Sequence, residues 1–285
     1  MSRPLAAFFG HHRCGTTYIN DILRQACREL NLRHVTVPNP RVFNHDLRTF
    51  VEDRGVGFLA YVNADYEYVK QLDQCRGFHV VRDPRDVCVS AYYSHLHSHP
   101  VTETFPELAE HRRKLQSLSK AEGLLLEMQF RAHEFQLMRQ WDYTLPHVLE
   151  LRFEDLVQNP YRHFLEVFRF LDLLDEESLG VGKRMLGLMC QGLRALEARS
   201  RGRLSFPLAP QRLPAERLLG IVWENDFTRK AEGRQPGQED RQSHYRKGVA
   251  GDWRNHFQAE HIAYFKSHYN DVLLKLGYEQ DADWD

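Results

Sequence analysis

The chain has few cysteines, and none lies in a bridging or metal-binding pattern. Among its 285 residues are five cysteines, an odd number, and no C-x-x-C pair. Neither a disulfide framework nor a zinc site is indicated. The sequence therefore predicts free thiols and a reducing, cytoplasmic setting.

An excess of one charge and long hydrophobic runs are also absent. Lys and Arg total 38 and Asp and Glu total 39, so the net charge is −1. Because nucleic-acid binders usually show a basic excess, no nucleic-acid partner is expected. No stretch approaches the roughly 20 apolar residues of a membrane span, and the first apolar run is too short for a signal peptide. With 42% hydrophobic residues, the chain is long enough to bury a sizeable core.

Short apolar runs alternate with helical patterns along the chain. Strands are predicted at 5–9, 33–37, 56–63, 76–84 and 147–153. Helices are predicted from Thr16, from Asp83-Pro84, after the capping box of Ser119 and Glu122, after Asn159-Pro160, and over 259–278. This alternation is typical of an α/β fold with a central parallel β-sheet flanked by helices. We expect one domain over 1–285, with a polar loop at 228–248, termed the lid loop, that is mobile.

The segment "GHHRCGTT", residues 10–17, joins the first predicted strand to the first helix. A glycine-flanked loop in that setting presents backbone N–H groups and a positive helix end to an anion. The spacing is that of a nucleotide-binding P-loop, but Thr16 stands at the lysine position and Arg13 is the cation in the loop. In P-loop NTPases that lysine reaches the β- and γ-phosphates. A ligand with a shorter phosphate chain than ATP is favoured, the alternative being a tight turn that binds nothing.

Two further segments offer cations. Arg82 lies at a strand end and Ser90 two turns into the next helix, at the edge where α/β sheets bind ligands. An arginine and a hydroxyl there can hold a phosphate by charge-assisted hydrogen bonds. The triplet Arg246-Lys247-Gly248 ends the lid loop. Taken alone, Arg82 fits an ion pair with Asp86 equally well, and the triplet fits a solvated charge run.

Taken together, these segments resemble the sulfotransferases that use 3′-phosphoadenosine 5′-phosphosulfate (PAPS). The matching stretches occur in the family's order: "HHRCGTTYI", "RDPRDVCVSAYY", "LRFEDL" and "YRKGVAGDWRNHF". The resemblance implies transfer of the sulfuryl group from PAPS to an acceptor hydroxyl, release of the product PAP, and no metal. The rival functions are a P-loop kinase or NTPase, and a nucleotide-binding protein without catalysis.

The resemblance also assigns roles to individual residues. It places Arg13 where the family has a loop lysine, so that Arg13 would neutralise charge on the leaving oxygen. It implies a 5′-phosphate site formed by Arg13, Cys14, Gly15, Thr16 and Thr17. The implied 3′-phosphate site comprises Arg82, Ser90, Arg246, Lys247 and Gly248. Phe153 stands where many members have a tyrosine near the adenine.

The general base is less clear, because Asn63 stands where soluble members often carry a catalytic histidine. Asparagine cannot accept the acceptor's proton. Asp65 is the first candidate and His45 the second, followed by His12 and Glu122. Each has a structural alternative: Asp65 as a helix cap, His45 as a surface residue, His12 as filling in the loop, and Glu122 as part of the capping box.

The run "SHLHSHP", residues 94–100, suggests a metal site through its alternating histidines. Alternate residues share a face only on a strand, whereas this run should end a helix. No nearby carboxylate or cysteine completes a ligand set in the sequence. We therefore expect no metal and interpret the run as a helix exit that lines the acceptor cleft.

Overall fold

A five-stranded parallel β-sheet forms the centre of the molecule. The computed structural model describes residues 4–176, 189 and 212–284. The strands are β1 (Leu5–Gly10), β2 (His34–Val37), β3 (Phe58–Tyr61), β4 (Cys75–Val81) and β5 (Val148–Arg152). They lie in the order β2-β3-β1-β4-β5, and every neighbouring pair is parallel. The predicted α/β class is confirmed, and each predicted strand is present with shifted ends.

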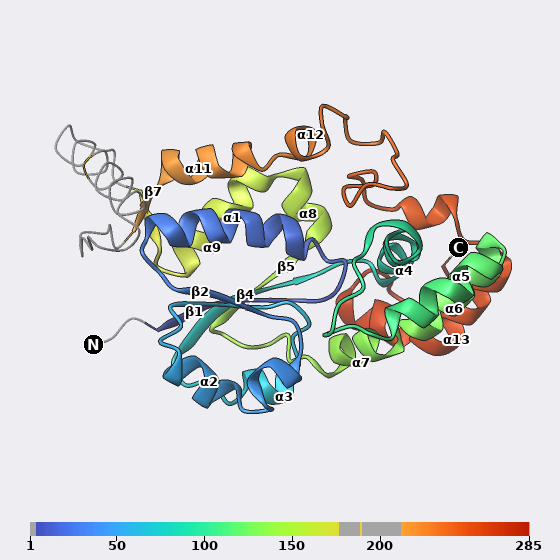
Figure 1. The fold of residues 1–285 in the computed structure, drawn as a ribbon, viewed down its shortest axis with the longest axis horizontal. Coiled ribbons are helices and arrows are strands. Elements are labelled where there is room, and N and C mark those ends of the chain that lie inside the picture. Colours follow the sequence, from blue (N-terminus) through green and yellow to red (C-terminus); the bar gives the residue numbers. More distant parts are fainter. Residues whose placement is uncertain (1–3, 177–188, 190–211, 285) are drawn as a thin grey trace.

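Helices cover both faces of the sheet, so the central strands are apolar on both sides. On one face lie α1 (Thr16–Glu29), α8 (Phe153–Gln158), α9 (Pro160–Phe170) and α11 (Ala215–Glu224) (Figure 1). On the other lie α2 (Leu47–Asp53) and α3 (Tyr66–Val69). The central strand β1 is accordingly buried from its second residue onward.

A group of helices packs beyond the carboxyl ends of the strands (Figure 1). It consists of α4 (Pro84–Tyr93), α5 (Leu108–Ser117), α6 (Lys120–Phe130), α7 (Ala132–Gln140) and the C-terminal α13 (Ala259–Leu276). Helix α13 contacts α4, α6 and α7. A hydrophobic cluster that includes Val89, Met128 and Phe265 joins these helices. The end of the chain thereby holds α4 in place at the end of β4.

Local signals set several helix boundaries as predicted. The carboxylate of Asp83 accepts the backbone N–H of Arg85 at 2.9 Å, and Pro84 is the first residue of α4. The capping box of Ser119 and Glu122 begins α6. Helix α4 ends at Tyr93 and continues as a π-helical turn, Ser94–Ser98.

Two boundaries differ from the prediction. The long helix expected after Glu122 is divided into α6 and α7 at Arg131, whose backbone leaves helical geometry at ψ 2°. Its buried guanidinium there bonds to Glu127 and Glu134. Strand β5 ends at Arg152, and Phe153 begins α8 instead of closing the strand.

The remaining elements are short. They are the 3₁₀ turns Pro40–Phe43 and Asp252–Asn255, the helix α12 (Phe227–Lys230), and the strand pair β6 (Leu174–Asp175) and β7 (Leu213–Pro214). Apart from the end of α12, the lid loop consists of turns and irregular chain, as predicted. Within residues 4–176 and 212–284, we find no helix that has both the length and the apolar character to span a membrane.

Candidate active site

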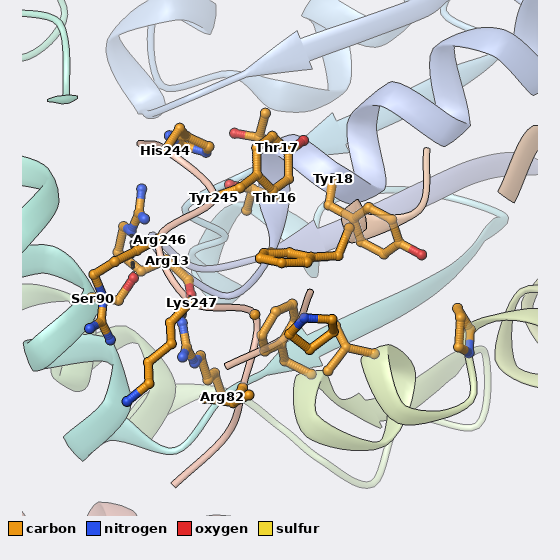
Figure 2. A pocket seen from close by; sticks show the side chains of 18 of the residues that line it. Arg13, Thr16, Thr17, Tyr18, Arg82, Ser90, His244, Tyr245, Arg246 and Lys247 are labelled. Carbon is orange, nitrogen blue, oxygen red and sulfur yellow. Dashed lines mark hydrogen bonds between the residues drawn. The ribbon is translucent and has the colours of Figure 1, made fainter. Parts of the chain in front are cut away.

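The predicted cofactor residues meet in one cavity at the carboxyl ends of β1 and β4. The cavity has a volume of about 250 Å³. All of the predicted cofactor residues except Cys14 line it: Arg13, Gly15, Thr16, Thr17, Arg82, Ser90, Phe153, Arg246, Lys247 and Gly248. Figure 2 shows Thr16, Thr17 and Tyr18 together on one side, with Arg13, Arg82, Ser90, Arg246 and Lys247 gathered opposite. Four segments distant in sequence thus form one site.

The loop before α1 leaves the helix end open toward this cavity. Arg13 and Gly15 adopt left-handed backbone angles, with φ of 66° and 78°. Gly15 is the N-cap of α1, and no side chain caps the helix. Because the first N–H groups of a helix have no partner within it, they remain available to a ligand. With the positive helix end, they form an anion site.

Phe153 packs directly against this loop. A Cβ atom at Gly15 would lie 2.5 Å from Cε2 of Phe153. The guanidinium carbon of Arg82 lies over the Phe153 ring, 5.0 Å from its centre. Phe153 therefore joins the loop after β1 to the end of β4, and its predicted place near an adenine stays a prediction.

The guanidinium groups of Arg13, Arg82 and Arg246 converge on the cavity. Arg13 donates from Nε to Oγ of Ser90 at 3.0 Å, and Arg82 donates from Nη1 to the carbonyl of Arg13 at 3.2 Å. Burial, together with Arg82 and Arg246, lowers the pKa of Arg13 to about 10. Within the part of the chain that the structure describes, no carboxylate forms an ion pair with Arg13. Such a cluster has a strong affinity for an anionic ligand.

The C-terminal basic segment is held in place by two buried aspartates. Arg246 and Lys247 both bond to Asp252. Asp86, on α4, accepts the backbone N–H groups of Gly251 at 2.6 Å and of Trp253 at 2.9 Å. Asp86 lies 3.9 Å from Arg82, so the ion pair considered from the sequence is long and Asp86 chiefly anchors the C-terminal segment.

The structure does not bring Cys14 to the cavity. Its side chain is fully buried, and its backbone N–H donates to the carbonyl of His11 at 3.1 Å. Burial raises the pKa of the thiol to about 12, so Cys14 carries no charge near neutral pH. We therefore assign Cys14 a packing role inside the loop, in place of the predicted role in the cofactor site.

The two leading candidates for the base lie outside the cavity lining. Asp65 is the N-cap of α3, and its carboxylate accepts the backbone N–H of Glu67 at 2.9 Å. His45 bonds through Nδ1 to the hydroxyl of Tyr68 at 2.6 Å. These contacts match the structural alternatives, and no geometry supports Asp65 or His45 as the base.

Asn63 and Glu122 also lie elsewhere. The side-chain amide of Asn63 donates to the carbonyl of Pro38 at 2.9 Å. Glu122 accepts the backbone N–H of Ser119 at 2.9 Å, within the capping box at the start of α6. Neither residue lines the cavity.

His12, in contrast, lines the cavity. Its Nδ1 lies 2.9 Å from Nη1 of Arg131. Burial lowers the pKa of His12 well below its usual range, and Arg131 adds to the effect. Because a guanidinium can only donate, Nδ1 of the neutral ring accepts, and the ring proton lies on Nε2.

One histidine of the run, His95, belongs to a buried cluster that the sequence did not reveal. His95, His111 and Glu127 place their ligand-type atoms within 4.8 Å of one another. No carboxylate was found near the run in the sequence, because Glu127 lies on α6 and His111 on α5, both distant from the run along the chain. Arg131 places Nε 3.1 Å from the same carboxylate, so a guanidinium already supplies the positive charge. This arrangement favours a buried ion-pair network over a cation site.

Several residues that line the cavity were not predicted, among them Tyr18, His244 and Tyr245, and His99 was expected only as part of a run lining the acceptor cleft. Tyr18 directly follows Thr17, and His244 and Tyr245 directly precede Arg246, so adjacency to a motif was the available signal. His99 lay within the histidine run, where no signal distinguished it from its neighbours.

A family model described as "Sulfotransferase domain" matches residues 8–180, more than half of the chain. No curated protein matches the chain. Solved structures that it resembles include a mouse sulfotransferase complexed with PAP, at 15% identity, TM-score 0.49, and coverage of 97% of this chain and 88% of that chain. A retinol dehydratase in complex with androsterone and PAP matches at 16% identity and TM-score 0.47, over 100% of this chain and 83% of that chain. With the family model spanning the phosphate loop and the strand-end arginine, the chain belongs to the sulfotransferase domain family.

Proposed function

We propose that this sulfotransferase takes the sulfuryl group of PAPS, transfers it to an acceptor hydroxyl and releases PAP. The observation that carries the proposal is the convergence of Arg13, Arg82 and Arg246 on one cavity beside the open end of α1. Arg246 is paired with Glu239 and Asp252, whereas Arg13 forms no ion pair with a carboxylate in the described part of the chain. Burying an unpaired cation such as Arg13 is costly unless an anion compensates it. PAPS offers two anionic groups, a phosphate at the 3′ position of its ribose and a phosphosulfate at the 5′ position.

The two phosphate sites follow from where the donors lie. We place the 5′-phosphosulfate at the start of α1, where Thr16 and Thr17 begin the helix. The 3′-phosphate would bind Arg82, Ser90 and the segment from Arg246 to Gly248. Arg13 lies between the two proposed phosphate sites, because its side chain bonds to Ser90 and its backbone belongs to the loop that leads into α1. Its charge would stabilise the 5′-phosphate as the bridging oxygen leaves.

We also propose that residues 1–285 form one sulfotransferase domain. Helix α13 packs on α4, α6 and α7, and forms no separate core. A reducing, cytoplasmic setting is part of the same proposal. Cys14, Cys27, Cys75 and Cys88 are free and buried, whereas Cys190 lies outside the described residues.

The test is a measurement of binding to PAP. PAP should raise the melting temperature of the wild-type protein, because a ligand of the native state stabilises it by mass action. Arg13→Gln and Arg82→Gln should each weaken PAP binding by about 10- to 100-fold, since each removes charge-assisted contacts worth roughly 1.5–3 kcal/mol. Arg24→Ala is the matched control, because Arg24 is an exposed residue of α1 paired with Asp21.

Two results would contradict the proposal. If millimolar PAP does not shift the melting temperature, PAPS is not the donor. A larger shift with ATP and Mg²⁺, and a turnover that EDTA abolishes and magnesium restores, would favour the kinase or NTPase. We expect turnover to survive EDTA.

A further inference from the structure

A sulfuryl transfer to a hydroxyl needs a group that takes the acceptor's proton, and the predicted candidates do not provide one. Asp65, His45 and Glu122 are engaged outside the cavity. His12 lines the cavity, but its Nδ1 accepts from Arg131 and its Nε2 bears the proton. A neutral ring in that tautomer donates a hydrogen bond and has no free lone pair to act as a base.

His99 is also in the cavity lining and has the opposite tautomer. Its Nδ1 lies 2.9 Å from the carbonyl oxygen of Pro100. A carbonyl can only accept, so Nδ1 carries the proton of the neutral ring and Nε2 carries the lone pair. No hydrogen bond of Nε2 is found in the described part of the chain. The nitrogen that could take a proton is therefore unoccupied.

The backbone fixes His99 at the end of the π-helical turn. Its N–H donates to the carbonyl of Ser94 at 2.7 Å. Arg112, from α5, donates to the carbonyls of both His95 and His99. Because Pro100 follows, His99 is held in an extended conformation, with ψ of 128°. The imidazole is thereby positioned by elements of the fold, as a catalytic group requires.

The surroundings keep the ring neutral. Burial lowers the pKa of His99 below its ordinary value of 6.5, the hydrogen bond to the carbonyl of Pro100 partly opposes this, and Arg13, Arg131 and Arg112 add to the lowering. Ionisable groups that face the ring are Arg13 and His12 from the loop after β1, His95 from the π-helical turn, Arg112 from α5, Arg131 between α6 and α7, and His244 from the lid loop. No carboxylate is among the groups that shift it. The free base is therefore the prevailing form at neutral pH.

Other histidines near the cavity fit the role less well. His97 is exposed and does not line the cavity. His244 lines the cavity, but burial, with Arg13 and His99, lowers its pKa to about 4, which makes it a weak base. No hydrogen bond that would fix its tautomer is found in the described part of the chain.

We propose that His99 is the general base of the transfer, a role that rests on the proposed use of PAPS. In the step, the Nε2 lone pair of His99 takes the proton of the acceptor hydroxyl. The acceptor oxygen forms a bond to sulfur as the bond from sulfur to the bridging oxygen breaks. The electron pair of that bond stays on the 5′-phosphate of PAP, beside Arg13. The imidazolium then returns its proton to solvent.

The test compares His99→Gln with His97→Gln, a change of the same kind two residues away on an exposed side chain. Turnover of radiolabelled PAPS is measured with 2-naphthol as the probe acceptor and with water alone. His99→Gln should lower turnover by about 10²–10⁴-fold, the contribution of a general base. His97→Gln should keep the wild-type rate, and both variants should bind PAP within about twofold of the wild-type affinity.

The pH dependence provides a readout that a merely structural role would not change. Because only the neutral ring has a lone pair, wild-type kcat/KM should fall with acid through an ionisation below 6.5. His99→Gln should lack that ionisation. A wild-type rate in His99→Gln would overturn the assignment.

A second measurement tests the tautomer of His99, and it does not require that 2-naphthol or water react with PAPS. Nitrogen-15 NMR of the histidine rings should show the proton of His99 on Nδ1, and a proton on Nε2 would also overturn the assignment. Failure of PAP to bind the wild-type protein would instead refute the proposed function, so the two failures are distinguishable.

Discussion

At the scale of single residues, Gly15 shows how tightly the phosphate loop is built. Its φ of 78° is unfavourable for any residue with a Cβ, and the space that a Cβ would need is filled by Phe153 at 2.5 Å. Two separate requirements therefore demand glycine at this position. The same contact couples the loop to α8, so a change at Gly15 displaces both.

We expect Gly15→Ala to cost more than backbone strain alone. Gly55 is a matched control, since its φ is 55° and no atom lies within 4 Å of a Cβ built there. Gly55→Ala should lower the free energy of unfolding by about 1–2 kcal/mol, and Gly15→Ala by about 2–5 kcal/mol, because overpacking adds to the strain. Urea unfolding measures both values. Equal losses would show that the contact with Phe153 relaxes freely.

At the scale of elements, the lid loop is folded around one arginine. The guanidinium of Arg234 donates to the carbonyls of Gln238, Tyr245 and Arg246. Backbone bonds also close the loop, from Gly237 to Lys247 at 2.8 Å. In Figure 1 the chain after α12 runs from the layer of α11 toward α4. The loop thus carries the segment from His244 to Gly248 to the cavity as a folded unit.

We predict that this loop moves and that PAP restrains it. Trypsin should cut the free protein after Arg241, which is exposed, before it cuts after Arg234, whose guanidinium is held inside the loop. PAP should slow the cut, because closure around a ligand reduces local opening. The variant Arg13→Gln, which binds PAP weakly, is the control and should gain little protection. Equal cutting of the wild-type protein with and without PAP would refute the lid.

At the scale of the whole molecule, several histidines are buried in their neutral form. His11 is fully buried and His12 lines the cavity from the same loop, and burial lowers the pKa of each well below its ordinary value. Burial also lowers the pKa of His95 to about 4. In the unfolded chain these rings bind protons near pH 6.5, whereas in the native protein they do so only at lower pH.

The native state should therefore lose stability in acid. Between about pH 6.5 and pH 4 the unfolded chain binds more protons, so the free energy of unfolding falls as the pH falls, by up to about 1.4 kcal/mol per pH unit for each such histidine. Urea unfolding at a series of pH values measures the slope. His97→Gln should leave the slope unchanged, because His97 is exposed. A constant free energy across this range would contradict the burial of neutral rings.

The sequence by itself determined the features that depend on neighbouring residues. The strand from Leu5, the start of α4 at Asp83-Pro84 and the open loop before α1 follow from local apolar runs, caps and glycines. The predicted cofactor residues other than Cys14 line one cavity, and each group of them lies within a short contiguous motif. Cys14 was the exception, because contiguity does not tell whether a side chain faces the cavity or the core.

Only the tertiary structure decided which groups meet from distant segments. Asp86 bonds to Gly251, 165 residues away, and Glu127 is joined to His95 and His111 from two other elements. The search for the general base shows the consequence. Asp65 was predicted from its position beside Asn63, and the structure engages it as a helix cap. His99 was identified only from its place in the cavity lining and from its bond to Pro100. The pKa of a histidine depends on desolvation and on charges that folding brings close, and whether the ring lines a cavity depends on packing, so the residues next to His99 encode neither property.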